Sequence, residues 1–464
     1  MKKNSIYKFI LVPAVLLSLQ SCFVAKDYTR PQVVEEEYFR TDLLPQDSLT
    51  MADVSWRELF TDPILAGYIE EGLQNNLDIR VALQQIEAAE AYMKQGKAGY
   101  LPTLNVGTTG ATQSPSDNGQ LGGIGTVSQF DLAANLSWEA DIWGKIRSSD
   151  RATQARYLQS VAGHQAVKTE LIATIASLYY QLLALDEQLR ITEQTIENRE
   201  NSLETTRALK DAGSLTEVGV KQTEAQLYRA QAVLVDLENN IRLLENAFSI
   251  VLGEAPHQIN RGSLAEQEIT TELKIGVPAQ LLRNRPDVIA AEYNLMNAFQ
   301  LTNVAKSSFY PSFRLTASAG LQSLEFEDWF SANSIFASVI GNLAQPIFNQ
   351  RQIRTQYEVA QAQEEIALLD FRRSLLVASR EVSDALYNYE AAIERMEIKL
   401  NEFEAYDLAT TYSEELLNNG MANYLEVLTA RENALNSQLE LINTELDKFI
   451  AIIDLYQALG GGWQ

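Results

Sequence analysis

Disulfides, catalytic motifs and membrane-spanning helices are all missing from this sequence. It has one cysteine, Cys22, in 464 residues, so no disulfide can form within one chain. Its two histidines, His164 and His257, are accompanied by no glycine-rich phosphate loop, nucleophile elbow or Cys/His metal spacing. Beyond the N-terminus, no apolar run reaches the roughly 18 residues that a membrane helix needs. We therefore expect no enzyme, no metal and no cofactor.

Positive charge is also scarce. Lysine and arginine number 37 against 61 aspartate and glutamate residues, which gives a net charge of −24. A surface this acidic repels nucleic acid and anionic lipid head groups. We therefore exclude nucleic acid as a partner.

Residues 1–21 have the pattern of a lipoprotein signal peptide, with an apolar stretch that ends in Leu19-Gln-Ser-Cys22. Three lysines form its cationic region: Lys2, Lys3 and Lys8. In this interpretation Cys22 becomes the lipid-bearing N-terminus, and residues 22–55 form an extended anchor segment. One lipid anchor usually needs a second membrane attachment. The alternative is an ordinary secretory signal with an incidental cysteine.

The remaining chain contains an internal duplication. Tyr100-Leu-Pro102 corresponds to Phe309-Tyr-Pro311, 209 residues later. Further pairs are Asp78 and Asp287 at 209, and Gly213 with Gly420 and Gly253 with Gly460 at 207. So long a period excludes a solenoid of small repeats. It predicts two helix–hairpin–helix–helix units, at 56–255 and 285–464, joined by a linker at 256–284.

Each unit is expected to contain a very long helical hairpin, at 144–252 and at 349–459. Proline is absent from 144–212 and 349–419, so each stretch can form one helix of roughly 100 Å at about 1.5 Å per residue. Gly213 and Gly420 suit the left-handed position after a helix. These two glycines therefore mark the tips of the two hairpins.

The returning helices have apolar residues at every seventh position, which predicts knobs-into-holes packing. These residues are Val220, Leu227, Leu234, Ile241 and Phe248 in the first half, and Met421, Leu428, Leu435, Ile442, Phe449 and Tyr456 in the second. An ordinary bundle core is the alternative. Glu432 interrupts the adjoining apolar row, and a polar residue in such a seam sets register or serves a switch.

Four short segments lie within strand hairpins at about 100–140 and 310–345. They are 104–111, 130–138, 313–322 and 335–343. Most alternate apolar and polar residues, as in the wall of a membrane barrel, whereas 335–343 alternates poorly. A soluble two-hairpin sheet is the alternative. Four strands cannot close a barrel, and open edges are not tolerated in lipid. Two copies leave only space for side chains, so three copies are the smallest number that leaves an open lumen.

Seven motifs, in order along the chain, resemble the TolC/OprM (NodT-type) family of outer-membrane efflux lipoproteins. They are Asp27-Tyr-Thr-Arg-Pro31, Trp56-Arg-Glu-Leu-Phe60 with Asp62-Pro63, Leu136-Ser-Trp-Glu-Ala-Asp-Ile-Trp-Gly-Lys-Ile-Arg147, Leu281-Leu-Arg-Asn-Arg-Pro-Asp287, Gln345-Pro-Ile-Phe348, Glu381-Val-Ser-Asp-Ala-Leu386 and Ala458-Leu-Gly-Gly-Gly-Trp463. The resemblance covers essentially the whole chain from Cys22 onward.

The resemblance implies a mainly α-helical, TolC-like trimer with a twelve-strand barrel in the outer membrane of a Gram-negative bacterium. Such a homotrimer is the exit duct of a tripartite pump, and its equatorial belt makes 256–284 an equatorial linker. Its partners are outer-membrane lipid, a periplasmic adaptor and an inner-membrane transporter of the resistance–nodulation–division (RND) class. A duct for type I protein secretion and a lipid-anchored coiled-coil scaffold are the competing hypotheses. The exported substrate is not readable from the sequence.

The resemblance also indicates where such a duct is gated. The family motif reads approximately Ser-Tyr-Leu-Asp-Val-Leu-Asp-Ala-Gln-Arg, and this chain has Asn423-Tyr-Leu-Glu-Val-Leu-Thr-Ala-Arg-Glu432. Leu425 fits the constricting ring, Thr429 replaces the usual aspartate, and Glu432 replaces the usual arginine. We therefore expect Glu432 or Glu426 to supply the acidic group at the gate, with Arg431 as its partner. Ordinary solvated charges are the alternative.

The hairpin tips resemble the surfaces on which the family's adaptor docks. The residues concerned are Gly213, Leu215, Thr216, Gly420, Met421 and Tyr424. Met421 and Leu215 are expected to be the exposed apolar contacts. Simple tight turns are the alternative.

Overall fold

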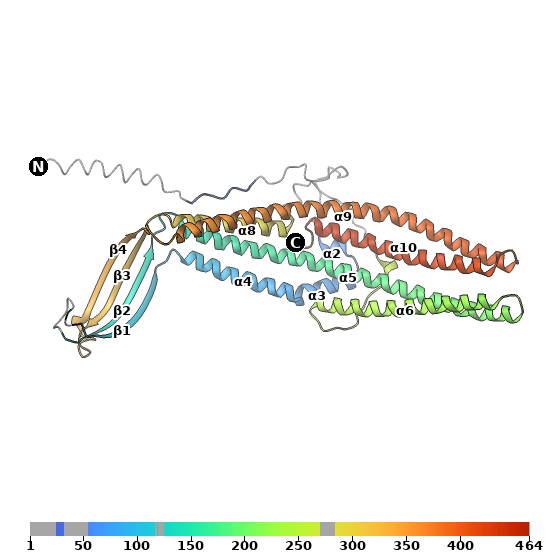
Figure 1. Ribbon diagram of the computed structural model, residues 1–464, viewed down its shortest axis with the longest axis horizontal. Coiled ribbons are helices and arrows are strands. Elements are labelled where there is room, and N and C mark those ends of the chain that lie inside the picture. Colours follow the sequence, from blue (N-terminus) through green and yellow to red (C-terminus); the bar gives the residue numbers. More distant parts are fainter. Residues whose placement is uncertain (1–24, 32–53, 117, 119–124, 270–283, 464) are drawn as a thin grey trace. The chain divides into compact units, whose positions relative to one another are not determined.

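The computed structural model describes residues 25–31, 54–116, 118, 125–269 and 284–463, which form two compact units (Figure 1). The first unit comprises residues 25–31, 86–160 and 291–371, and the second comprises the other described residues. Each unit draws on both halves of the duplicated sequence. Cys22, the signal peptide and most of the anchor segment lie outside the described residues, as does half of the equatorial linker.

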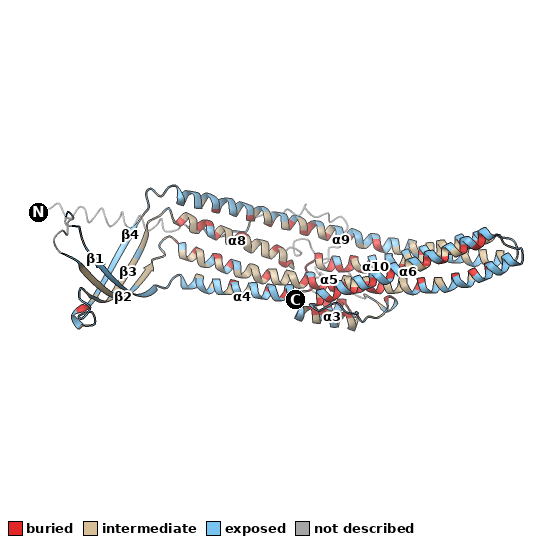
Figure 2. Cartoon of the chain, turned by 60° about the horizontal axis from the view of Figure 1, so that its bottom comes forward, coloured by how far each residue is buried: buried red, intermediate tan, exposed pale blue. Residues whose placement is uncertain are grey.

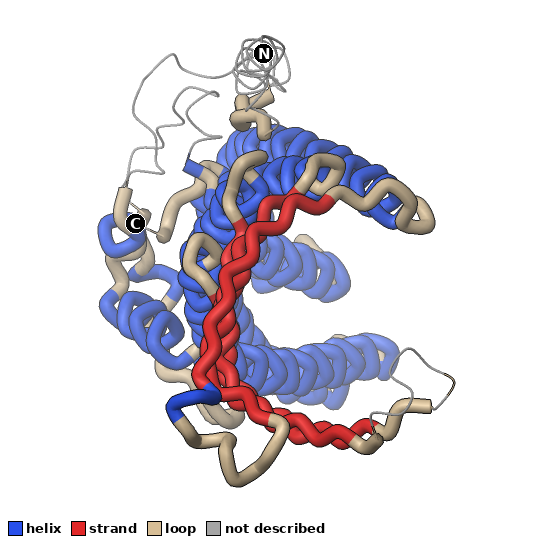
Figure 3. Tube along the Cα trace, turned by 90° about the vertical axis from the view of Figure 1, so that its left-hand side faces the viewer, coloured by secondary structure: helices blue, strands red, loops and turns tan. Residues whose placement is uncertain are grey.

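The first unit contains a four-stranded antiparallel sheet in the order β1-β2-β3-β4. The bounds are Thr103–Gln113 for β1, Val127–Glu139 for β2, Ser312–Ser323 for β3 and Ile335–Ala344 for β4. These strands contain all four predicted segments, which confirms them. The strands form a curved wall (Figure 3). Among the described residues, no strand pairs with the outer edge of β1 or of β4.

The strand register gathers the apolar side chains on one face of the sheet. Leu136 of β2 lies opposite Leu104 of β1 and Ala317 of β3, and Ala317 lies opposite Val339 of β4. The segment 335–343, which alternates poorly in the sequence, is nevertheless a strand of this sheet. The residues of β4 that share the apolar face are Ile335, Ala337, Val339, Gly341 and Leu343. Phe336 and Ile340 interrupt the alternation because they add apolar side chains to the opposite face.

The opposite face is polar on β2 and β3, where side chains link the two strands. The Gln322 side-chain amide donates to Asp131 at 2.8 Å, and the Ser318 hydroxyl donates to Asn135 at 2.5 Å. Arg314 forms an ion pair of 3.3 Å with Glu139. One face suited to lipid and one suited to water is the pattern of a barrel wall.

Four α-helices contribute to the described part of the first unit. They are α4 (Leu77–Ala98), α5 (Lys145–Asp211), α8 (Pro286–Ser307) and α9 (Gln352–Asn418). Helices α5 and α9 each run for 67 residues and contribute to both units, which confirms the predicted long helices. No described helix combines the length and the hydrophobicity needed to span a bilayer.

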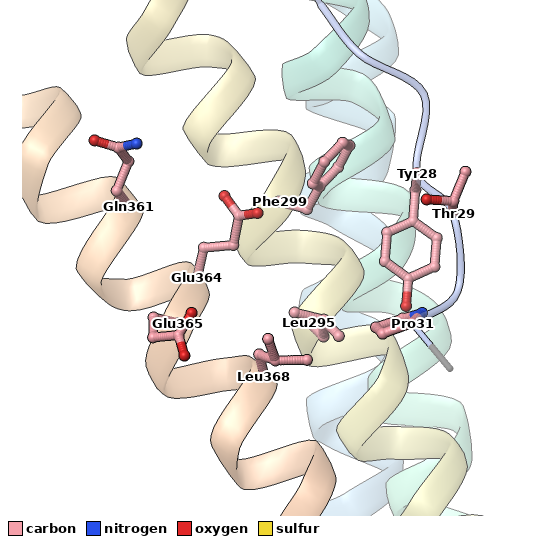
Figure 4. Close-up of a pocket in the computed structure, with 9 residues that line it drawn as sticks. All are labelled: Tyr28, Thr29, Pro31, Leu295, Phe299, Gln361, Glu364, Glu365 and Leu368. Carbon is pink, nitrogen blue, oxygen red and sulfur yellow. The ribbon is translucent and has the colours of Figure 1, made fainter. Parts of the chain in front are cut away.

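The segment 25–31 lies against helices of the first unit. Asp27 forms an ion pair of 2.8 Å with Arg151, and the Tyr28 ring meets that of Phe299 edge-on at 5.7 Å. A cavity of about 410 Å³ lies between this segment, α8 and α9 (Figure 4). It is lined by Tyr28, Thr29, Pro31, Leu295, Phe299, Gln361, Glu364, Glu365 and Leu368. These contacts hold residues 25–31 against the helices of the first unit.

The described part of the second unit adds four α-helices around an aromatic core. They are α2 (Trp56–Leu59), α3 (Pro63–Asn75), α6 (Glu217–Leu252) and α10 (Tyr424–Ala458). Tyr180 of α5 stacks on Phe449 of α10 with ring centroids 4.5 Å apart. The buried residues gather along α5, α6 and α10 (Figure 2). Buried Arg261 forms ion pairs with Asp186 at 2.5 Å and Glu245 at 2.6 Å, and so holds the start of the linker onto α5 and α6.

The duplication extends to individual hydrogen bonds. The Asn76 side chain donates to the Val251 carbonyl at 2.7 Å, and its counterpart Arg285 donates to the Ala458 carbonyl at 3.2 Å. Gly253 and Gly460 both have positive φ, and a Cβ on either would lie within 2.7 Å of a backbone carbonyl oxygen. In both halves, the end of the last helix therefore makes the same contacts with the residues that precede an earlier helix.

Candidate gate and hairpin tips

Both hairpin tips are built on the predicted glycines. Gly213 has φ of 79° and Gly420 has φ of 74°, and nothing lies within 4 Å of a Cβ built on either. The Ser214 amide donates to the Leu209 carbonyl at 2.9 Å, and the Met421 amide donates to the Leu416 carbonyl at 2.8 Å. This pattern is the Schellman motif, in which a left-handed residue satisfies the last carbonyls of a helix.

The exposed apolar residues at the tips differ in part from the prediction. Met421 is 70% exposed, as expected, but Leu215 is half-buried against the small core cluster of Leu203, Val220 and Leu227. Leu215 folds over Gly219, where the absence of a Cβ leaves room for its side chain. Val218, at 65% exposed, is the apolar residue that the first tip presents. Thr216 serves as N-cap of α6, since its hydroxyl accepts a hydrogen bond from the Gly219 amide at 3.4 Å.

Asn423 and Glu426 form the start of α10. The Asn423 side chain accepts from the Glu426 amide at 3.1 Å and donates to the Glu426 carboxylate at 3.0 Å. This reciprocal arrangement resembles a capping box. Glu426 is therefore an exposed capping residue. Tyr424 lies beside it, and its hydroxyl accepts from Thr223 of α6 at 3.4 Å, which links the second hairpin to the first.

Leu425 and Thr429 lie together on an exposed surface of α10. Leu425 is 54% exposed, and the Thr429 hydroxyl donates to the Leu425 carbonyl at 2.9 Å. Thr429 therefore offers the surface no charge and one hydroxyl that is already used within the helix.

Glu432 is held by two arginines from the first hairpin. Its carboxylate lies 2.7 Å from Arg199 of α5 and 2.6 Å from Arg229 of α6. The side chains of Glu432 and Arg199 are only 17% and 10% exposed. Arg199 also donates to the Gln226 carbonyl. The expected acidic group at the gate is therefore a compensated charge that ties α10 to α5 and α6.

Arg431 does not pair with Glu432 or Glu426, and that prediction is wrong. It forms an ion pair of 2.7 Å with Glu414 of α9 and donates to the Ser202 hydroxyl of α5 at 2.5 Å. Because adjacent residues of a helix point in different directions, Arg431 and Glu432 reach different neighbours. The sequence did offer a signal for Arg199 and Arg229, because both lie within 16 residues of Gly213, as Glu432 lies within 12 of Gly420.

Exposed ion pairs surround the first tip. Lys210 and Glu217 lie 2.7 Å apart across the turn. Their hydrogen bond raises the pKa of Lys210 and lowers the pKa of Glu217, so both groups stay charged over a wider pH range. Lys221 and Glu224 form a similar pair of 2.6 Å on α6, which likewise raises the pKa of Lys221.

This arrangement joins the two hairpins through charged and polar side chains. Across the described ranges, no three His, Cys, Asp or Glu side chains are placed to hold a metal ion. A sheet with a lipid-suited face, together with long hairpins fastened at their tips, defines a subunit of a membrane duct.

Comparisons with known proteins agree with this class. The family model described as "Outer membrane efflux protein" matches residues 68–254 and 277–461. The chain belongs to the outer membrane efflux protein family. It is an outer-membrane channel of an efflux system and not an enzyme, and it has the TolC-like fold that its motifs predicted.

Two relatives and one solved structure illustrate the similarity. The solvent efflux pump outer membrane protein SrpC of Pseudomonas putida is 29% identical, over 98% of this chain and 99% of that protein. The probable outer membrane lipoprotein SilC of Salmonella typhimurium is 27% identical, over 97% and 98%. The outer-membrane channel OprN has a TM-score of 0.87 and 24% identity, covering 95% of this chain and 99% of that one.

Proposed function

We propose that this chain forms a homotrimeric exit duct of a tripartite efflux system. Small molecules or metal ions would pass through it after delivery by an RND transporter of the inner membrane and a periplasmic adaptor. The names of its relatives are those of efflux-pump components, which supports export of small solutes over protein secretion.

The observation that carries this proposal is the sheet with two open edges. Because it has four strands, β1 and β4 run in opposite directions, so β4 of one copy can continue the antiparallel order with β1 of the next. Lipid does not tolerate unpaired strand edges. A ring of three copies closes every edge and is the smallest ring with an open lumen.

Exposed apolar residues on the helices also support assembly. Four of them follow α6 at intervals of seven or eight residues and are 58–64% exposed: Tyr228, Val235, Leu243 and Ile250. Helix α9 also exposes apolar residues, at less regular intervals, including Ile366, Leu376, Ile398 and Leu408. The regular spacing of the exposed apolar residues on α6 is typical of a helix that packs against another.

The hairpin tips are the proposed gate and docking surface. In the closed state Glu432, Arg199 and Arg229 hold α10 against the first hairpin, and opening requires these contacts to exchange. Leu425 and Thr429 are proposed to line the constriction. Met421 and Val218, both strongly exposed, are the proposed apolar contacts for the adaptor.

Lipid attachment at Cys22 completes the proposal. The sequence around Cys22 supports it, and so does the description of SilC as a probable lipoprotein. Residues 27–31 would then follow the anchored cysteine within a few residues and hold it to the first unit through Asp27 and Arg151.

The proposal is tested on the full chain extracted from membranes in detergent. Native mass spectrometry should give the mass of three chains, and reconstitution into a planar lipid film should give ion conductance. A stable monomer without conductance would contradict the proposed function.

A further inference from the structure

The two hairpins of the sheet are related by the shifts of the duplication. Thr103 pairs with Ser137 in the first hairpin, and Ser312 pairs with Ala344 in the second. The first strand is therefore displaced by 209 residues and the second by 207, which are the shifts found in the sequence motifs. Ten of the eleven pairs of the β1–β2 register map onto pairs of the β3–β4 register in this way; the exception is Gln113 with Val127.

The two halves of the chain meet where β2 pairs with β3, and we call this pairing the template seam. It suggests how β4 of one copy could pair with β1 of the next, which we call the seam between copies. In the β2–β3 pairing Leu136 lies opposite Ala317. The same shifts carry Leu136 to Leu343 of β4 and Ala317 to Thr108 of β1. We propose that β4 pairs with β1 of a second copy in the register that sets Leu343 opposite Thr108 of the next copy. This inference rests on the proposed oligomer and names its residue pairing.

The side chains on the polar face support this register. The Ser318–Asn135 hydrogen bond of 2.5 Å maps onto Thr109 and Asn342, which again are a hydroxyl and an asparagine. The Gln322–Asp131 hydrogen bond of 2.8 Å maps onto Gln113 and Ser338, which again are a glutamine donor and an oxygen acceptor. Two hydrogen bonds can therefore be re-formed between copies.

The backbone continues the match beyond the strands. The Ala140 amide donates to the Phe313 carbonyl at 3.0 Å, and this pair maps onto Ile347 and Leu104. Ile347 is 78% exposed and Leu104 is 64% exposed in one chain, as expected for residues that a second copy covers.

The proposed seam also lacks two contacts of its template. Trp143 stacks on Tyr310 at 4.9 Å, but the residue equivalent to Trp143 is Gln350. The ion pair of Arg314 with Glu139 has no equivalent, because the mapped residues are Asn105 and Pro346. The seam between copies therefore depends more on its backbone hydrogen bonds than the seam within the chain does.

Disulfide trapping tests the register in the full-length chain. The Thr108→Cys/Leu343→Cys variant places both thiols on directly opposite positions, about 4.5–5.5 Å apart at Cβ. Mild oxidation should convert its monomer band on a non-reducing denaturing gel into a covalent trimer. The Thr108→Cys/Gly341→Cys variant displaces one thiol by two residues to about 7–8 Å, beyond the reach of a disulfide, so its monomer band should remain.

Two controls separate the register from folding and from assembly. Leu136→Cys/Ala317→Cys places thiols on the template seam and should form a disulfide within one chain, with no change in chain number. The unmodified chain reports any cross-link through Cys22. Cross-linking by the Thr108/Gly341 pair would overturn the register alone. So would the absence of cross-linking by the Thr108/Leu343 pair in a preparation that has the mass of a trimer. A monomeric mass with an intact template disulfide would instead overturn the proposed function.

Discussion

Glu432 carries its charge where little water reaches it. Its side chain is 17% exposed and is held by one arginine that is nearly buried and one that is 65% exposed. Removal of one partner from a buried pair leaves the other charge uncompensated and costs more than the pair contributes. Loss of one of its partners therefore weakens the contact strongly, as the proposed latch between the hairpins requires.

The Glu432→Gln variant should open the gate more often. The neutral amide leaves Arg199 without a carboxylate. We expect the free energy that favours the closed state to fall by about 1–3 kcal/mol, which lies between the values for fully buried and for exposed ion pairs. A loss of about 1.4 kcal/mol shifts the equilibrium tenfold towards the open state. Single-channel recording in planar lipid films measures this as shorter closed times.

The matched control for this variant is Asp447→Asn. Asp447 pairs with Arg395 at 3.0 Å, but both side chains are 53% exposed. Such a surface pair contributes little, so gating should not change. An open probability equal to that of the unmodified chain in Glu432→Gln would contradict a latch at this position.

At the level of elements, most of the fold could be predicted because its signals are local. The absence of proline predicted α5 and α9, and Gly213 and Gly420 predicted where the hairpins turn. The partners of Glu432 could not be predicted, because Arg199 and Arg229 belong to another hairpin and a heptad pattern does not say which helices meet. Leu215 was predicted to be exposed but is half-buried. Its burial depends on the space above Gly219, which the local sequence does not reveal.

Gly460 follows the end of α10 in the second repeat and should not tolerate a side chain. Its φ is 86°, and a Cβ would lie 2.7 Å from the Asn284 carbonyl oxygen. Gly460→Ala therefore combines left-handed strain with a backbone clash, and we expect it to lose more than about 2 kcal/mol of unfolding free energy. Denaturant unfolding followed by helical circular dichroism measures the loss.

Two other glycines separate the causes of that loss. Gly213 has φ of 79° but open space around it, so Gly213→Ala should cost only the strain of about 1–2 kcal/mol. Gly163 lies within α5, and nothing lies within 4 Å of a Cβ built on it, so Gly163→Ala should be neutral or stabilising by up to about 1 kcal/mol. A Gly460→Ala variant no less stable than Gly213→Ala would rule out the clash.

At the scale of the whole molecule, charge opposes the proposed assembly. Each chain carries a net charge of −24, so bringing three copies together concentrates negative charge around one axis. The proposed pairing of β4 with β1 of the next copy has no counterpart of the Arg314–Glu139 ion pair, so no ion pair is expected there to offset this charge. Backbone hydrogen bonds and apolar helix contacts must therefore outweigh the repulsion between copies.

This balance predicts that salt stabilises the oligomer. The screening length falls from about 30 Å at 0.01 M salt to about 8 Å at 0.15 M, which weakens the repulsion between copies and leaves apolar contacts intact. We expect the temperature at which trimers dissociate, read by semi-native electrophoresis, to rise with salt over this range. Ion pairs between copies would respond in the opposite sense, because screening weakens them as well. A dissociation temperature that falls with salt would therefore place attractive charge contacts at the interface and contradict an assembly held by backbone pairing and apolar packing.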